Sequence, residues 1–285
     1  MIFPQQTLNC DGKLLDLGTP KIMGVINVTP DSFFADSRQE ALADILLVAE
    51  QMLEAGADIL DIGGMSSRPG AEIITVDQEL QRVIAPIKAI KERFPEAIIS
   101  IDTVHASVAS EAVKVGASII NDISAGRIDQ EMYDTVAKLG VPYILMHMRG
   151  TPATMQQQPD YEDVVREILD FFIQEVALLR QKGVKDIVVD PGFGFGKTVR
   201  QNYELLQGLN LFQILEAPVL AGVSRKSMIN KLLGIGPSEA LNGTSVVHLL
   251  ALQNGASILR VHDVKEAREV VKIWQFMEDL KNTPQ

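Results

Sequence analysis

Cysteine is almost absent from this sequence, which contains Cys10 and no second cysteine in its 285 residues. A disulfide within the chain is therefore excluded, and a reducing compartment is the expected environment. The sequence also lacks any apolar run that approaches the roughly 18 residues needed for a membrane helix. Its first residues show no basic segment followed by an apolar run, so we expect no signal peptide and a cytoplasmic location.

Basic residues are in the minority, because 26 lysines and arginines stand against 37 aspartates and glutamates, for a formal net charge of −11. Such a chain repels polyanions, so we expect no nucleic-acid partner. Aromatic residues make up only 5% of the chain, while 46% of the residues are hydrophobic. The core must therefore be built from aliphatic side chains, and the length suits one large domain.

What the sequence does contain is one unit repeated along its length: a short apolar run, a polar or glycine-rich loop, and a longer helical pattern. The apolar runs lack strict alternation, as expected of parallel strands buried on both faces. We predict strands at Ile22–Asn27, Asp58–Ile62, Ile98–Asp102, Ser118–Asp122, Tyr143–His147, Asp186–Asp190, Pro218–Gly222 and Ser257–Val261. Eight near-regular repeats favour an α/β fold closed into a single (β/α)8 TIM barrel over an open doubly wound sheet.

The helical patterns lie between these strands, and several end at a glycine, which closes a helix by adopting a left-handed conformation. They are predicted at Glu40–Ala55, Val76–Arg93, Val104–Val115, Gln130–Leu139, Tyr161–Lys182 and Val264–Leu280. Before the first strand, Thr7–Leu17 is typical of a β-hairpin that turns at Asp11–Gly12. We therefore predict one barrel domain over residues 1–285, with an N-terminal hairpin extension over residues 1–20 that covers the bottom of the barrel.

Polar residues end almost every predicted strand. They are Asn27, Asp61, Asp102, Asn121, Asp122, His147 and Asp190, then Arg225 and Lys226 after the seventh strand, and Arg260 and His262 at the eighth. Each alone is also explained as a turn or cap residue, which Asp and Asn commonly are. Because the carboxyl ends of barrel strands form the catalytic face, the collective pattern favours one polar cavity.

The chemistry of this set suggests two subsites. Asp102, Asn121 and Asp190 offer hydrogen-bond acceptors to a flat heterocycle rich in N–H groups, and Lys226 offers it a donor. Arg260 is suited to holding an anion together with His262.

Two other patterns carry less weight. The segment Gly192–Thr198 is similar to a phosphate-binding P-loop, but Pro191 stands where that pattern requires glycine. We interpret the segment as a glycine-rich turn that brings backbone and Phe195 to a flat ligand. The four histidines have no paired metal-ligand spacing, so a zinc site is not expected.

The motifs at the strand ends resemble those of the dihydropteroate synthase family, in the same order and over essentially the whole chain. They are Met23–Phe33, Asp61–Gly64, Ser67–Gly70, Ser100–Thr103, Ile120–Ile123, Met146–His147, Asp190–Lys197, Gly222–Ser227 and Arg260–His262. The resemblance implies a transferase of folate biosynthesis that joins 6-hydroxymethyl-7,8-dihydropterin diphosphate to p-aminobenzoate. The products would be 7,8-dihydropteroate and pyrophosphate.

The resemblance also implies a role for each matching position. The pterin would be bound by Asp102, Asn121, Ile123, Met146, Asp190, Phe195, Gly222, Lys226 and Arg260. The diphosphate would be bound by Asn27, Arg68, Arg260 and His262, and p-aminobenzoate, near the family's sulfonamide site, by Phe33, Ser67, Pro69, Lys226 and Ser227. Mg²⁺ is the implied cofactor, with Asn27 as its protein ligand. The implied catalytic set is Asn27, Asp102, Lys226, Arg260 and His262.

These residues include no obvious nucleophile pair for covalent catalysis. A diphosphate held by Mg²⁺, arginine and histidine can leave early, and the cationic methylene carbon left behind is conjugated with the pterin. The neutral aryl amine then attacks without needing a strong base. We therefore expect a dissociative substitution driven by charge stabilisation and positioning.

One segment departs from the family pattern. After Ser32 and Phe33 the family usually continues Ser-Asp-Gly-Gly, whereas this chain reads Phe34-Ala35-Asp36-Ser37. The aspartate is displaced by one place and the glycines are missing, so we expect this loop to close differently.

Two other functions share parts of the pattern. A methyltetrahydrofolate:corrinoid methyltransferase would use the same pterin slot but would not need the loops at Ser67–Pro69 and Ser224–Ser227, which favour the synthase. A non-catalytic pterin-binding barrel would bind ligand without turnover. The family likeness further implies a homodimer formed through barrel helices, and apolar positions near Phe171, Phe172 and Trp274 are compatible with such an interface.

Overall fold

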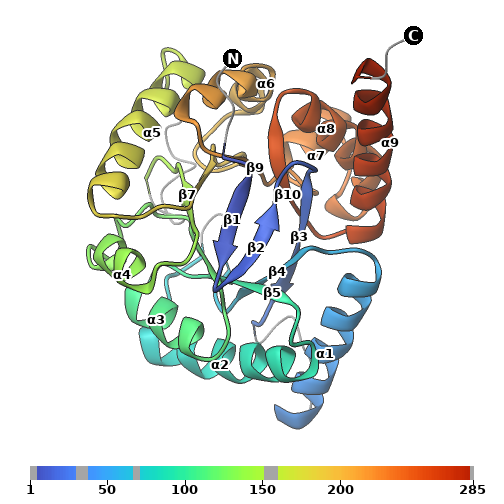
Figure 1. Cartoon of the computed structure of the whole chain (residues 1–285). Coiled ribbons are helices and arrows are strands. Elements are labelled where there is room, and N and C mark those ends of the chain that lie inside the picture. Colours follow the sequence, from blue (N-terminus) through green and yellow to red (C-terminus); the bar gives the residue numbers. More distant parts are fainter. Residues whose placement is uncertain (1–4, 30–37, 67–70, 151–159, 283–285) are drawn as a thin grey trace.

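In a computed structural model of the chain, eight parallel strands close into a barrel surrounded by helices (Figure 1). The structure describes residues 5–29, 38–66, 71–150 and 160–282. The barrel strands are β3 (Lys21–Asn27), β4 (Ile59–Gly63), β5 (Ile98–Asp102), β6 (Ile119–Asp122), β7 (Tyr143–Met146), β8 (Ile187–Asp190), β9 (Val219–Ala221) and β10 (Ala256–Val261). Neighbours follow the sequence, and β10 closes the ring by pairing with both β9 and β3. The predicted TIM barrel is confirmed, and each strand ends within one residue of its predicted limits.

The helices form the outer layer of the barrel. They are α1 (Arg38–Glu54), α2 (Val76–Arg93), α3 (Ala106–Lys114), α4 (Met132–Leu139), α5 (Val164–Gln181), α6 (Val199–Gln207), α7 (Ser227–Leu233), α8 (Leu241–Gln253) and α9 (Val264–Asn282), with short 3-10 helices η1 (Leu209–Leu215) and η2 (Pro237–Glu239). The six helices predicted by range are confirmed, while α6, α7 and α8 have no counterpart among them. Gly140 illustrates the predicted helix ends, because it adopts φ +68° and donates its N–H to the Val136 carbonyl. No described helix is long and apolar enough to cross a membrane.

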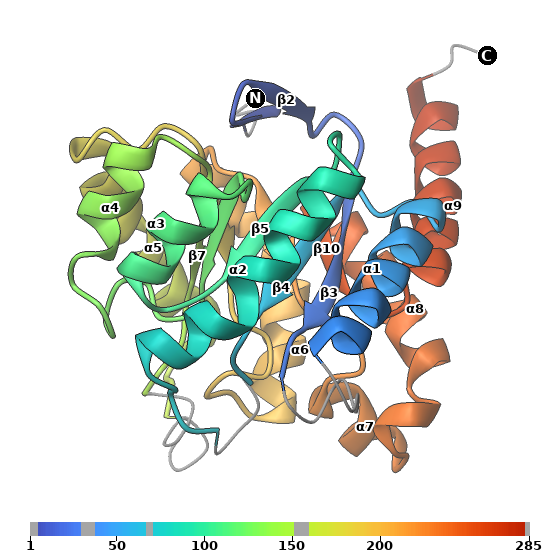
Figure 2. The ribbon, with the colours of Figure 1, turned by 90° about the horizontal axis from the view of Figure 1, so that it is seen from below.

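The N-terminal hairpin lies across one end of the barrel (Figure 2). Strands β1 (Thr7–Cys10) and β2 (Lys13–Asp16) pair antiparallel. Asp11 and Gly12 both have positive φ, at +54° and +84°, as a two-residue type I′ turn requires. The hairpin and its turn therefore match the prediction.

Beneath the hairpin, the barrel interior is closed by a layer of apolar side chains, which we call the barrel floor. Each barrel strand contributes one residue to it, and the hairpin contributes four. The floor consists of Met23, Ile59, Ile98, Ile119, Ile144, Val188, Leu220 and Ile258, packed against Leu8, Cys10, Leu15 and Leu17. The hairpin covers the bottom of the barrel, as expected, and the open mouth lies at the carboxyl ends of the strands.

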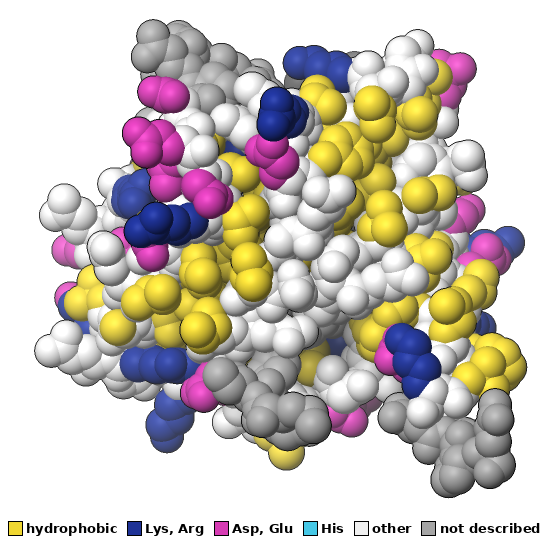
Figure 3. Space-filling model, turned by 90° about the horizontal axis from the view of Figure 1, so that it is seen from above, with side chains coloured by type: hydrophobic (Ala, Val, Ile, Leu, Met, Phe, Trp, Pro, Cys, Tyr) yellow, Lys and Arg dark blue, Asp and Glu magenta, His cyan; other side chains and the backbone are white. Residues whose placement is uncertain are grey.

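The homodimer interface expected near Phe171, Phe172 and Trp274 stays a prediction, and exposed apolar side chains do lie beside these positions, at Ile173 on α5 and Ile273 on α9. Phe172 is fully buried, and Phe171 and Trp274 are partly buried against the core between strands and helices. The exposed apolar side chains on the last three helices are Leu232, Leu233, Val246, Leu250, Ile273, Phe276, Met277 and Leu280, which we call the α7–α9 face. Figure 3 shows hydrophobic side chains gathered in a band on this side of the molecule.

Candidate active site

Above the barrel floor, the inward-facing positions change from apolar to mostly polar. Successive residues of a strand point to opposite faces, so the residue two places after each floor residue faces the interior again. This second layer consists of Val25, Asp61, Ser100, Asn121, Met146, Asp190, Gly222 and Arg260. Five residues to which the family resemblance gives a pterin role, from Asn121 to Arg260, therefore face the barrel interior on the mouth side of the floor.

Arg260 is the centre of the second layer. Its Nε donates to Asp61 Oδ2 at 2.7 Å, and its Nη2 donates to Asp102 Oδ2 at 2.6 Å. Asn121 Nδ2 donates to the same Asp61 oxygen at 3.2 Å. Asp61 is fully buried, and its Oδ1 has no hydrogen-bond partner among the described residues. Four strands thus supply one polar cluster that retains capacity to bind a ligand.

The electrostatics of this cluster favour ligands that carry N–H donors. Burial raises the pKa of Asp102 above its usual value, and the Arg260 guanidinium opposes that effect. Burial alone would lower the pKa of Arg260, but Asp61 and Asp102 outweigh it and raise the pKa above its ordinary value. Arg260 is therefore always a cation, and it shares its charge between two carboxylates.

Gly222 lies between three functional side chains, and a side chain at this position would contact all of them. A Cβ at this position would lie 3.6 Å from Lys226 Nζ, 3.8 Å from Asp190 Oδ2 and 3.9 Å from Arg260 Cβ. Burial lowers the pKa of Lys226 to about 8, against the effect of Asp190, so the amine is mainly protonated at pH 7. The absence of a side chain at Gly222 thus leaves the Asp190 carboxylate and the Lys226 ammonium facing the same position.

An apolar cluster lies beside the second layer at the mouth of the barrel. It consists of Met65, Val104, Ile123, Met146, Met148 and Phe195. Three of these were assigned to the wall of the pterin slot by resemblance, and the structure places them in contact with one another. The Phe195 ring centroid lies 4.6 Å from Lys226 Nζ, which is a cation–π distance. The mouth thus combines an apolar wall with a charged and amide-lined edge.

The glycine-rich segment after β8 differs from a phosphate-binding loop in the direction of its backbone groups. Its carbonyls at positions 192 and 195 accept hydrogen bonds from Lys197 Nζ, and the carbonyl at 193 accepts one from Lys226 Nζ. Its N–H groups at 192 and 194 donate to the side chains of Asp190 and Asn202. Phosphate loops present free N–H groups, so the structure supports a turn that shapes the slot and not a nucleotide site.

His147 follows β7 and packs beside the glycine-rich segment. Its Nδ1 lies 3.3 Å from Lys197 Nζ. Burial, reinforced by the Lys197 charge, lowers the pKa of His147 to about 2, so the ring is neutral. Within the described ranges, no three His, Cys, Asp or Glu residues are grouped to hold a metal ion.

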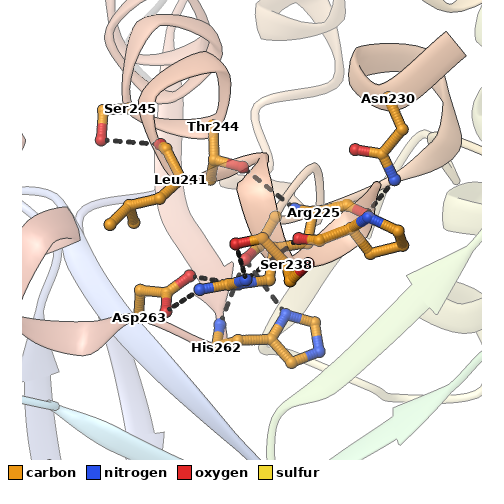
Figure 4. A network of polar contacts seen from close by, with 10 residues as sticks. Arg225, Asn230, Ser238, Leu241, Thr244, Ser245, His262 and Asp263 are labelled. Carbon is orange, nitrogen blue, oxygen red and sulfur yellow. Dashed lines mark hydrogen bonds and ion pairs between the residues drawn. The ribbon is translucent and has the colours of Figure 1, made fainter. Parts of the chain in front are cut away.

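A second polar network ties the loop after β9 to the end of β10 (Figure 4). Arg225 adopts φ +54°, and its Nε and Nη2 donate to the two carboxylate oxygens of Asp263 at 2.7 and 2.8 Å. Its Nη1 donates to the carbonyls of Pro237 and Ser238 at 3.0 and 3.2 Å. The guanidinium is fully engaged within the protein, so Arg225 belongs to the framework and not to an anion site.

His262 is in the same network, and its neighbours determine the charge state of its ring. Its backbone N–H donates to Ser224 Oγ at 3.2 Å, and its ring Nδ1 lies 3.0 Å from that oxygen. Burial of the ring, reinforced by the Arg260 charge, lowers the pKa of His262 below its ordinary value. The imidazole is therefore neutral at pH 7 before ligand binds, and it offers a hydrogen bond instead of a full charge.

The remaining predicted residues are only partly within the described structure. Asn27 ends β3 at the mouth, pairs with Gly63 of β4 and is partly exposed. Ser227 is the exposed first residue of α7. Phe33, Ser67, Arg68 and Pro69, and the departing segment at residues 34–37, lie outside the described residues.

Strand geometry also separates two neighbouring polar residues that the sequence presents together. Asn121 faces the barrel interior, whereas Asp122 faces the helices. There Asp122 accepts hydrogen bonds from the N–H and hydroxyl of Ser124, the N–H of Gly126 and the hydroxyl of Tyr143, all at 2.7 Å. Asp122 is therefore structural, and Asp61, which was given no ligand role, is the residue that sequence reasoning missed.

Comparisons with known proteins agree with this geometry. A model of the pterin binding enzyme family matches residues 23–262. Dihydropteroate synthase of Escherichia coli K12 is 46% identical over 268 residues, which span 93% of this chain and 94% of that protein. The chain belongs to the dihydropteroate synthase family. The methyltransferase alternative is not supported by these matches.

Solved structures of the dihydropteroate synthase family share the whole fold. The Xanthomonas albilineans enzyme with 4-aminobenzoic acid superposes with a TM-score of 0.89 at 39% identity, covering 96% of this chain and 98% of that one. The enzyme from the same species in complex with 7,8-dihydropteroate superposes with a TM-score of 0.85 at 37% identity, covering 95% and 98%. The likeness thus extends over the floor, the second layer and the surrounding helices alike.

Proposed function

We propose that this chain catalyses the dihydropteroate synthase reaction, joining 6-hydroxymethyl-7,8-dihydropterin diphosphate to p-aminobenzoate with release of pyrophosphate. The observation that carries the proposal is the second layer, in which Arg260 lies between Asp61 and Asp102 above a closed apolar floor. Such a layer provides acceptors and a fixed cation to one flat heterocycle. Relatives named dihydropteroate synthase at 40–46% identity support the same conclusion.

In this proposal the pterin enters edge first. Asp102, Asn121 and Asp190 hydrogen bond to its amino and ring N–H groups, and Lys226 exchanges its bond to the Phe193 carbonyl for one to the ring. The apolar cluster around Met146 and Phe195 contacts one face. Because these groups are held by the barrel strands, the pterin is oriented before the second substrate binds.

The chemical step is proposed to be dissociative. Arg260, aided by a hydrogen bond from His262, stabilises the charge that develops on the departing diphosphate. The nearby carboxylates of Asp61, Asp102 and Asp190 favour the cationic carbon that is left. The p-aminobenzoate amine then forms the new C–N bond and loses its proton to solvent, while Lys226 and Ser227 hold its carboxylate side.

A coupled assay tests this function directly. The protein is mixed with dihydropterin diphosphate, p-aminobenzoate and Mg²⁺, and pyrophosphate release and dihydropteroate formation are both measured. Equal amounts of the two products are expected. Binding of the pterin without turnover would instead support a non-catalytic pterin-binding barrel, and methyl transfer from methyltetrahydrofolate to a corrinoid would support the rival enzyme.

Mg²⁺ is proposed as the cofactor, and the residues present fit an ion that takes one ligand from the protein and the others from the diphosphate and water. Asn27 supplies a carboxamide oxygen at the mouth, and Mg²⁺ commonly takes one or two protein ligands with phosphate oxygens and water. Mg²⁺ would neutralise charge on the diphosphate. We expect chelation of Mg²⁺ to abolish most turnover, and Asn27→Ala to raise the Mg²⁺ concentration for half-maximal rate about tenfold. An unchanged Mg²⁺ dependence in Asn27→Ala would exclude Asn27 as the ligand.

The Arg225–Asp263 pair is expected to support catalysis by holding Lys226 and His262 in place. Arg225→Gln and Asp263→Asn should each lower kcat/KM about tenfold, because a charged, partly buried hydrogen bond contributes about 1.5 kcal/mol. The double variant should be no worse than the poorer single variant, since both remove one interaction. Additive losses in this double-mutant cycle would show that the two side chains act separately.

A homodimer is proposed through the α7–α9 face. This face exposes Phe276 at 66% and Leu280 at 61%, and contiguous apolar surface of this kind marks an interaction site. We expect sedimentation to give a dimer and Phe276→Glu to give a monomer. Leu178→Glu, on an exposed apolar position of α5, is the control and should remain dimeric. A monomeric wild-type protein would refute the assembly.

We also propose that the protein acts in the cytoplasm. Its only cysteine, Cys10, lies in the barrel floor, where burial raises the pKa of the thiol to about 12 and the side chain serves as an apolar group. No function in the proposal requires an oxidising compartment. Fractionation of cells that express the tagged protein checks this placement.

A further inference from the structure

Lys197 is a buried lysine to which the proposed function gives no role. It follows the glycine-rich segment after β8, and the residue is only 5% exposed. Its Nζ donates to the carbonyl oxygens of Gly192 at 2.9 Å and Phe195 at 3.0 Å, and it lies 3.3 Å from His147 Nδ1. Three acceptors match the three N–H bonds of one ammonium group.

The neighbouring charges are consistent with this arrangement. His147 is neutral, so its Nδ1 can accept the third hydrogen bond if the ring proton is on Nε2. Burial lowers the pKa of Lys197 to about 7, with Asp190 acting in the opposite direction and Lys226 and Arg149 reinforcing the decrease. Deprotonation would remove one of the three donors, so the full set of bonds requires the ammonium form.

The segment that Lys197 holds is packed tightly on both sides. A Cβ at Gly192 would lie 2.0 Å from the His147 carbonyl oxygen, and one at Gly194 would lie 3.2 Å from Lys226 Cδ. Both glycines have positive φ, at +72° and +82°. The segment therefore lies against the end of β7 on one side and against Lys226 on the other, and it has little room for a second position.

The same segment supplies two elements of the pterin slot. The Phe195 ring belongs to the apolar wall, and the Phe193 carbonyl accepts the hydrogen bond that holds Lys226 Nζ at 2.5 Å. Asn202 already fixes the outer side of the turn, since its Oδ1 accepts from the Gly194 N–H at 2.7 Å. A buried charge on the inner side is therefore not needed merely to close the turn.

We propose that Lys197 is a positioning residue: its hydrogen bond to the Phe195 carbonyl fixes the position of the Phe195 ring in the apolar wall and thereby sets the affinity of the slot for the pterin ring. This role rests on the proposed function. Lys197 itself does not touch the pterin, because its three donors point to the segment and to His147.

Binding of 6-hydroxymethylpterin, followed by its own fluorescence, tests the role without requiring turnover. Lys197→Met, which keeps the length of the side chain but has no donors, should raise the Kd about tenfold. Arg200→Gln changes an exposed cation three residues further along the chain, whose ion-pair partner in the described part of the chain is Glu204, and should leave the Kd within twofold. Near-ultraviolet circular dichroism confirms the fold of each variant. If Lys197→Met does not fold, Lys197→Gln replaces it in the same comparisons.

A double-mutant cycle separates positioning from a general effect on stability. In a Phe195→Leu background the slot has lost its ring, so Lys197→Met should change the Kd by less than threefold. A full tenfold loss in both backgrounds would overturn the positioning role, as would wild-type affinity in Lys197→Met alone. A wild-type protein that does not bind the pterin would overturn the proposed function and this role together.

Discussion

Arg260→Ala is expected to lower kcat/KM for the dihydropterin diphosphate by roughly 10²- to 10⁴-fold. The substitution removes the cation that we place beside the leaving diphosphate, and removing one group that stabilises developing charge costs about 10²- to 10³-fold in rate. In addition, Asp61 and Asp102 are left buried without their shared counter-ion, which disturbs the slot itself. Initial rates of pyrophosphate release at saturating Mg²⁺ and p-aminobenzoate measure the effect.

A matched control is the arginine–aspartate pair at the opposite end of β4, the strand that carries Asp61. Arg268 on α9 pairs with Asp58 at 2.5 Å and also donates to the Gly56 carbonyl, so it reproduces the arginine–aspartate contact on the floor side of β4. Arg268→Ala should lower the Tm but leave kcat/KM within threefold. Equal losses of activity in Arg260→Ala and Arg268→Ala would mean that both act through stability, which would contradict the assigned role of Arg260.

Gly222→Val is expected to weaken pterin binding strongly while the fold remains intact. The added Cβ alone would meet Lys226, Asp190 and Arg260 at ordinary contact distances of 3.6–3.9 Å, and Gly222 is not among the glycines with positive φ. The valine methyl groups would instead occupy the space that we assign to the ring edge. Forcing such groups into a filled site costs about 1–3 kcal/mol, so the Kd should rise by roughly 10- to 100-fold.

Calorimetric titration with the pterin measures this change, and thermal unfolding checks the fold. Gly236→Val is the control, since this partly exposed glycine precedes η2 with an extended backbone that valine adopts readily. Both variants should unfold within a few degrees of the wild type. Unchanged pterin affinity in Gly222→Val would show that the ring binds elsewhere in the mouth.

The fold was predictable because a parallel barrel leaves strong local signals. The buried strands appear as short aliphatic runs, and the turn at Asp11 and Gly12 requires positive φ at both residues, which explains its sequence. The helices α6, α7 and α8 were not separately predicted. Helix α8 is apolar over most of its surface, so its sequence lacks the one-sided pattern by which amphipathic helices are recognised.

Only part of the site was predictable, because a residue's position at a strand end does not reveal whether its side chain faces the barrel interior or the helices. Asn121 and Asp122 are adjacent in sequence, yet one faces the barrel interior and the other binds the turn at Ser124. Counting two residues onward from the floor residue would have separated them. The engagement of Arg225 by Asp263 and the neutral state of His262 arise from tertiary neighbours, which no local pattern contains.

The closed floor has a consequence for the order of events during turnover. The hairpin and the barrel floor close one end of the barrel. Substrates and products must therefore enter and leave at the other end, where the carboxyl ends of the strands lie. The pterin ring, which we place beside Asn121 on an inward-facing strand position, would lie deeper than the p-aminobenzoate, which we place beside Ser227 at the start of α7. We therefore expect the dihydropterin diphosphate to bind before p-aminobenzoate. The dihydropteroate product, whose pterin ring still occupies the barrel interior, is expected to leave after pyrophosphate.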